Sequence, residues 1–162
     1  MNTTIIFAVI AVAILCLILY ALLKTKENSV PPTLQTLKNF AERNGSEIIE
    51  HDNQDNLAIG LSVKDKTVYF LKLIEGQQVL HHVRTNEVRQ PRLDMKMRKS
   101  RNQGEEAVET ISLVFQHKDA TKPPVKFEFY NLENDTLSVY GEFELAQKWL
   151  KIIEEKMKVN NS

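Results

Sequence analysis

The feature that most constrains this chain is a run of nineteen consecutive apolar residues, Ile5–Leu23, followed at once by Lys24 and Lys26. As a helix the run would be roughly 28 Å long, which is about the thickness of the hydrocarbon core of a bilayer. The run therefore predicts one membrane-spanning helix, and the rest of the chain folds while it is tied to a membrane.

Two kinds of cleaved leader peptide also contain an apolar run, and neither fits this one. A secretory signal has a basic first segment, a shorter apolar stretch and a cleavage site of small residues, whereas no basic residue precedes Ile5 here. A lipoprotein signal has a small residue before its cysteine, but Leu15 precedes Cys16. We therefore interpret the run as an uncleaved anchor.

The charges beside the run predict its orientation. Lys24 and Lys26 follow it and no basic residue precedes it, so the positive-inside rule places the N-terminus outside and the C-terminal domain in the cytosol. The only cysteine, Cys16, lies in the anchor, so the domain has no disulfide. The expected segments are a membrane anchor at 1–23, a linker at 24–32, a cytosolic domain at 33–158 and a tail at 159–162.

The domain has the size of one ordinary folding unit, and its charge is balanced. The chain has 21 basic and 21 acidic residues, and without residues 1–29 the numbers are 19 and 20. A general nucleic-acid binder is normally basic overall, so we expect no nucleic-acid partner.

Hydrophobic periodicity predicts mainly strands between two helices. Apolar residues at helical spacing from Leu34 to Ala41 predict a short helix that ends at Gly45. The pattern then changes to alternation, which is typical of strands, and Leu57–Val63 is expected to bury only one face. Pro91 favours an edge position for its segment. The expected strands are Leu57–Val63, Thr67–Ile74, Val79–Val83, Ile111–Gln116 and Val125–Tyr130, with weaker patterns at Ser46–His51 and Val88–Arg98.

The chain closes with an amphipathic helix from about Phe143 to Met157. Its apolar side chains, Trp149 among them, fall on one face, and most of its charges lie opposite. This face must cover apolar surface, and the sheet is the only large candidate. The predicted fold class is α+β, with an antiparallel sheet of about seven short strands and a C-terminal helix.

This order of elements resembles a pleckstrin-homology-like (PH-like) domain. The segments Ile111–Gln116, Phe127–Tyr130 and Ala146–Ile153 are also similar to small bacterial single-pass membrane proteins of unassigned function. The resemblance implies a bent sheet or barrel whose open end is plugged by the last helix, with Trp149 in the plug. A single-sheet α+β sandwich with both helices on one face fits the same pattern.

The resemblance does not extend to phosphoinositide binding. Members of the superfamily that bind these lipids have basic residues around the first hairpin loop, whereas His51–Asn56 is acidic and polar here. The fold alone therefore implies an interaction module.

One segment, Arg84–Arg101, is strongly basic. Beside a membrane such residues attract anionic lipid or an acidic partner, whereas on an edge strand they prevent strand-to-strand aggregation. A hairpin through residues 102–104 would set Glu105, Glu106 and Glu109 against these bases. The candidate contact residues are Arg84, Arg89, Arg92, Lys96, Arg98, Lys99 and Arg101.

We find no catalytic, cofactor-binding or metal-binding motif. The chain lacks glycine-rich phosphate loops and nucleophile signatures. His81 and His82 are neighbours on a predicted strand and should face opposite sides of the sheet, so they do not form a shared metal site. Tyr69, Tyr130 and Tyr140 are expected near the surface, where tyrosine is common at interfaces.

Three functions remain as hypotheses. The first is a membrane-anchored, non-enzymatic interaction or scaffold module that binds a protein partner at the inner face of the membrane. The alternative is a domain that senses anionic lipid through residues 84–101. The third is a membrane-tethered enzyme, for which no residues can be named.

Overall fold

The computed structural model describes residues 14, 30–99, 106–135 and 139–159, without the side chains of Lys99 and Val159. The chain divides into two compact units, residues 1–31 and residues 32–162. Apart from Ile14, the predicted anchor Ile5–Leu23 lies outside the described residues, as does most of the predicted linker and tail. Within the described ranges, no helix is both long enough and apolar enough to cross a membrane.

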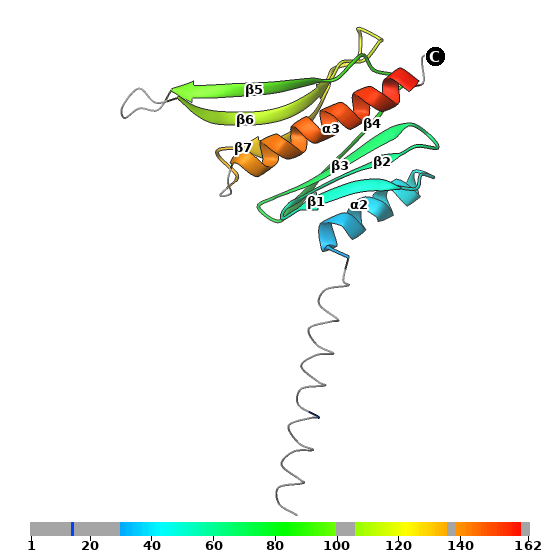
Figure 1. Ribbon diagram of the computed structural model, residues 1–162, viewed down its shortest axis with the longest axis horizontal. Coiled ribbons are helices and arrows are strands. Elements are labelled where there is room, and N and C mark those ends of the chain that lie inside the picture. Colours follow the sequence, from blue (N-terminus) through cyan, green and yellow to red (C-terminus); the bar gives the residue numbers. More distant parts are fainter. Residues whose placement is uncertain (1–13, 15–29, 100–105, 136–138, 160–162) are drawn as a thin grey trace, which may run out of the picture. The chain divides into compact units, whose positions relative to one another are not determined.

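The second unit is an α+β fold with two antiparallel sheets (Figure 1). The predicted single-sheet alternative is therefore wrong, because the strands separate into two sheets between β4 and β5. The four-stranded sheet has the order β1 (Glu50–Gln54), β2 (Leu57–Ser62), β3 (Thr67–Ile74), β4 (Gln77–Arg84), and the three-stranded sheet has the order β5 (Arg92–Lys99), β6 (Glu106–Phe115), β7 (Val125–Asn131).

Local turn chemistry sets the strand register in the first sheet. Between β3 and β4, Glu75 and Gly76 both have positive φ, at 50° and 80°, as a two-residue type I′ hairpin turn requires. The turn pairs Ile74 with Gln77 and continues to Thr67 opposite Arg84.

Helix α2 (Pro32–Arg43) covers one face of the four-stranded sheet. It ends before Gly45, whose φ of 74° suits the left-handed position after a helix. Because α2 covers this face, every residue of β2 is buried, and the prediction that this strand buries only one face is wrong. Two residues of α2 and four residues that pack beneath the helix form a small second core: Leu37, Ala41, Ile48, Ala58, Tyr69 and Leu71.

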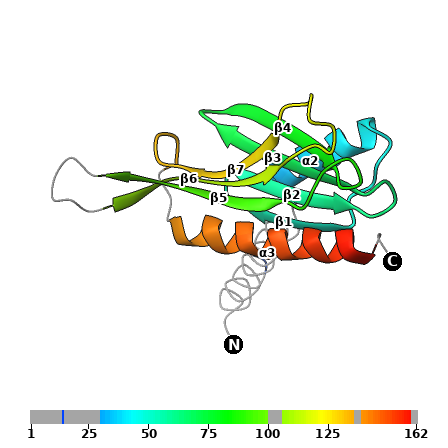
Figure 2. The same cartoon turned by 90° about the horizontal axis from the view of Figure 1, so that it is seen from above.

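Helix α3 (Val139–Val159) completes the main core, together with the inner faces of both sheets. Phe70 of β3 stacks on Phe127 of β7 with ring centroids 4.9 Å apart, so aromatic rings join the two sheets. Trp149 of α3 is fully buried in this core. Figure 2 shows α3 running along one side of both sheets. The helix begins at Val139, four residues earlier than the sequence predicts.

Polar contacts fix α3 to the four-stranded sheet as well. Asp52 of β1 accepts a hydrogen bond from the indole Nε1 of Trp149 at 2.8 Å and one from Lys148 Nζ at 2.7 Å. The helix therefore packs on β5, β6 and β7 through its apolar face. It contacts β1 through the hydrogen bonds to Asp52.

Two of the three tyrosines expected at the surface are buried, so those predictions are wrong. Tyr69 lies under α2 and its hydroxyl donates to Ser46 Oγ at 2.6 Å, while Tyr130 lies in the main core. Tyr140 is 69 % exposed at the start of α3, as predicted.

Candidate functional site

The candidate site is built on β5, the edge strand of the three-stranded sheet. The structure confirms the edge position that Pro91 suggested, because β6 is the only strand paired with β5 among the described residues. Figure 2 shows β5 and β6 projecting together past the start of α3. We call this projecting part, residues 95–99 and 106–111, the β5–β6 arm.

One face of the arm is apolar and partly exposed. Met95 and Met97 are 42 % and 48 % exposed, which is unusual for residues whose strand neighbour Leu93 packs against the core. Met95 lies at the side of an apolar pocket of about 270 Å³ between the arm and the first turns of α3. The pocket is lined by Met95, Val108, Ile111, Val139, Tyr140 and Phe143.

A β-bulge allows this pocket to form. The register between β5 and β6 shifts at Lys96 and Met97, so that Met95 pairs with Ile111 and Met97 pairs with Val108. The extra β6 residue places Val108 and Ile111, which are three positions apart, on the same pocket wall.

The opposite face of β5 is basic. Arg92, Lys96 and Arg98 alternate with the apolar residues and are exposed, and Asp94 is the one carboxylate among them. Arg98 lies 3.8 Å from Glu133, a distance typical of a weak surface ion pair. Three of the seven predicted contact residues therefore share one face of one strand.

The other predicted residues lie elsewhere. Arg84 ends β4 and contacts Glu87 at 3.4 Å, and Arg89 is in the loop between β4 and β5. The backbone of Lys99 ends β5 opposite Glu106, while Arg101 is outside the described residues. The predicted β5–β6 hairpin is confirmed as a strand pair, although its turn is not described.

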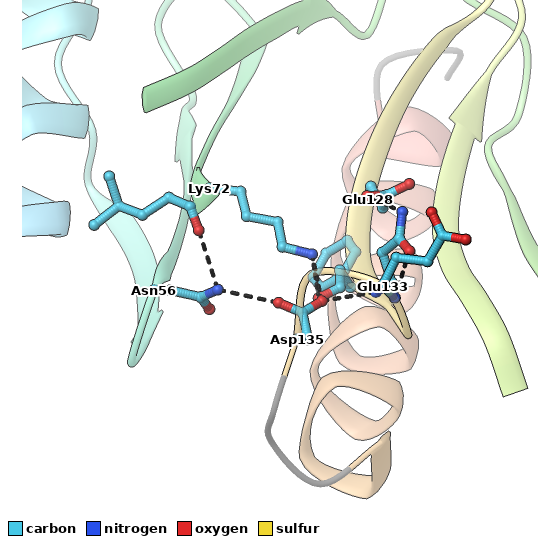
Figure 3. Close-up of polar contacts among 8 residues, drawn as sticks. Asn56, Lys72, Glu128, Glu133 and Asp135 are labelled. Carbon is cyan, nitrogen blue, oxygen red and sulfur yellow. Dashed lines mark hydrogen bonds and ion pairs between the residues drawn. The ribbon is translucent and has the colours of Figure 1, made fainter. Parts of the chain in front are cut away.

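A buried polar network holds the chain between β7 and α3 in place (Figure 3). Lys72 Nζ donates to Asp135 Oδ2 at 2.7 Å, and the two side chains are only 1 % and 4 % exposed. Asp135 also accepts from the backbone N–H of Asn131 at 2.7 Å and from Asn56 Nδ2 at 3.2 Å. The network therefore connects both sheets to the segment that leads into α3, whose first turns line the apolar pocket.

A separate groove of about 490 Å³ lies between β3, β4 and β7. His81 lines it with Lys72 of β3 and Lys126 of β7. His82 faces the other side of the sheet and stacks on Tyr69 at 5.8 Å, so the predicted opposite orientation of the two histidines is confirmed. Burial, with a contribution from nearby His82, lowers the pKa of His81.

We expect acidification to destabilise the protein partly through His81. Its pKa is lowered in the folded state, so below the unfolded-state value of about 6.5 the unfolded chain binds a proton that the folded chain does not, and unfolding is favoured. The urea midpoint of H81N should therefore fall less than that of the wild type between about pH 7.5 and about pH 5.5. Equal pH dependence of H81N and the wild type would contradict this account.

No group of three or more His, Cys, Asp or Glu residues is arranged to hold a metal ion in the described part of the chain. No protein family, curated protein or solved structure matches this chain.

The apolar half of the site was not recognised from the sequence. Its signal was present, since Leu93, Met95 and Met97 alternate with charged residues. The basic pattern concerns only one face of the strand. The pocket on the other face depends on α3, which is more than forty positions away along the chain.

Proposed function

We propose that residues 33–158 are a PH-like interaction module, held at the inner face of a membrane by Ile5–Leu23, and that the module is non-enzymatic. Two antiparallel sheets closed by a C-terminal helix with a buried Trp149 support the PH-like assignment. The anchor and its orientation rest on the apolar run and the two lysines after it.

The partner that fits best is an extended segment of another protein that adds a strand to β5. An edge strand presents unpaired backbone N–H and C=O groups, and addition of a strand satisfies them. Alternate side chains of the added strand would lie beside Met95 and Met97 on one face and beside Lys96 and Arg98 on the other. Cross-strand pairs contribute about 0.2–1 kcal/mol each, so the segment should alternate apolar and acidic residues.

The same charge pattern disfavours a second copy of this chain as the partner. In a dimer, two β5 strands would pair edge to edge, with the methionines of both copies on the same face of the joined sheet. The other face would then bring together the bases of both copies, Arg92, Lys96 and Arg98. Asp94 is the single carboxylate that each copy offers there. Like charges on neighbouring strands are destabilising, so a different, acidic partner is favoured. The observation that carries the proposal is this edge strand with exposed methionines on one face and bases on the other.

The test uses the full chain in neutral detergent and a synthetic peptide of alternating glutamate and valine, eight residues long like β5. We expect saturable binding that K96E/R98E weakens at least about tenfold, because attraction becomes repulsion. The same variant should gain affinity for a peptide of alternating lysine and valine. R84E is the control for charge reversal outside the arm and should bind the acidic peptide as the wild type does.

Two outcomes would contradict the proposal. One is no saturable binding of the acidic peptide, and the other is equal weakening by R84E. The alternative, anionic-lipid sensing, predicts that residues 30–162 float with anionic but not neutral vesicles and that salt and K96E/R98E abolish this binding. That result without peptide binding would replace the protein partner with lipid.

A further inference from the structure

A third cavity, of about 300 Å³, lies at the end of the domain where β5 begins. It is independent of the β5–β6 arm, because it is formed by connections between strands and by the last turns of α3. The lining residues that matter here are Lys66, Thr85, Asn86, Arg89, Lys118 and Met157. We call it the basic cavity.

Each of the three cations comes from a different loop, and backbone hydrogen bonds hold the loops together. Lys66 O in the β2–β3 turn accepts from both N and Oγ1 of Thr85, at 2.8 and 3.0 Å. The N–H of Arg89 donates to Gln116 O at 2.8 Å, and the N–H of Lys118 donates to Glu87 O at 2.9 Å. The cations are thus placed by the fold and not by flexible segments.

Among the described residues, no carboxylate lines the basic cavity. In the described part of the chain, none of the ion pairs includes Lys66, Arg89 or Lys118. Two flanking carboxylates have other partners, since Glu87 contacts Arg84 at 3.4 Å and Glu154 accepts from Gln90 Nε2 at 2.8 Å. Three cations therefore line one cavity that no described carboxylate lines.

The end of α3 does not oppose an anion here. A helix C-terminus carries a partial negative charge, which repels anions. The last turn of α3 contains Lys156 and Lys158, and such basic residues offset that charge. Met157 supplies an apolar wall between them.

We propose that the basic cavity binds a phosphate group, in the form of a phosphomonoester or a pyrophosphate. Arginine and lysine are the side chains that bind phosphate oxygens, through charge-assisted hydrogen bonds, and Asn86 adds an amide. The volume suits a small phosphorylated group. The cavity lies on three other connections and not in the first hairpin, His51–Asn56, where the resemblance would place a lipid site.

The test is calorimetric titration of the full chain in neutral detergent with inorganic pyrophosphate. We expect saturable binding, and we expect each of K66Q, R89Q and K118Q to weaken it about tenfold, the loss that goes with one hydrogen bond to a charged group. A matched triple variant, R43Q/K64Q/K122Q, removes the same charge from exposed residues that do not line the cavity. It should bind pyrophosphate as the wild type does.

Three outcomes would overturn the proposal. They are no saturable binding by the wild type, binding that persists in K66Q/R89Q/K118Q, or an equal loss in the matched triple variant. Unchanged circular dichroism of the variants, whose replaced residues are all exposed, shows that the fold is retained.

The source of the phosphate is distinguished by a pair of ligands with the same headgroup. Glycerol 3-phosphate and a short-chain phosphatidic acid differ only in the acyl chains. Tighter binding of the phosphatidic acid, lost in K66Q/R89Q/K118Q, supports the proposal with a lipid headgroup as the source. Equal or tighter binding of glycerol 3-phosphate, lost in the same variant, supports it with a soluble phosphate compound.

Discussion

Replacement of Asp135 with alanine is expected to lower the free energy of unfolding by about 3–5 kcal/mol, because it leaves a buried ammonium without a counter-charge. Lys72 and Asp135 are almost fully buried, and Asp135 accepts three hydrogen bonds. Domains of this size have only about 5–15 kcal/mol of stability, so the loss would be a large share of the total. Urea unfolding followed by fluorescence of the single tryptophan, Trp149, measures it.

Glu133 provides the matched control, because it is a carboxylate two positions away in the same turn. Its side chain is 72 % exposed and lies 3.8 Å from Arg98. E133A should cost less than about 1 kcal/mol, as exposed ion pairs do. If D135A were as mild as E133A, the Lys72–Asp135 pair would not be buried as the structure has it, and the chain before α3 would not be fixed by it.

Replacement of Trp149 with alanine is expected to cost about 3–5 kcal/mol, the range for removal of a large aromatic side chain from a core. The side chain is fully buried between α3 and the sheets. Because α3 also lines the apolar pocket with Val139, Tyr140 and Phe143, W149A should weaken binding of the acidic peptide as well. Thermal unfolding followed by circular dichroism measures the stability of a variant that lacks the fluorophore.

Variants at Asp52 and Lys148 separate the hydrogen bond of Trp149 from its packing. D52A leaves the indole N–H without its acceptor, which should cost about 1–3 kcal/mol. K148A removes only the exposed partner of Asp52 and should cost less than about 1 kcal/mol. Equal effects of the two variants would show that the indole hydrogen bond does not help to fix α3.

The two proposed sites depend on different structural features of the domain. The β5–β6 arm requires that β5 has one edge with which no described strand pairs. Its specificity comes from the alternation of methionine and basic residues along that strand. The basic cavity requires three connections to remain together, and its specificity comes from cations that are 23 and 29 positions apart in the sequence. Variants of one site should therefore leave the other unaffected.

Local sequence patterns determined most of the secondary structure. The strand patterns located β2, β3, β4, β6 and β7, and Pro91 indicated an edge strand. These features depend on a few neighbouring residues, so the sequence displays them directly. The weak pattern at Ser46–His51 gave a strand in the wrong place, because β1 (Glu50–Gln54) is polar and its position is decided by pairing with β2.

Tertiary structure decided which faces are covered and which distant residues meet. Tyr69 alternates like a surface residue, but α2 packs over it, and no local pattern states where a helix will lie. Lys72 lies in an otherwise apolar strand, and this pattern indicates a buried partner. The partner is Asp135, which is 63 positions away and cannot be identified from a local pattern. The pocket beside Met95 and the cluster of Lys66, Arg89 and Lys118 exist only because separate elements pack together. Periodicity is a property of neighbours along the chain, whereas a binding site is a property of neighbours in space.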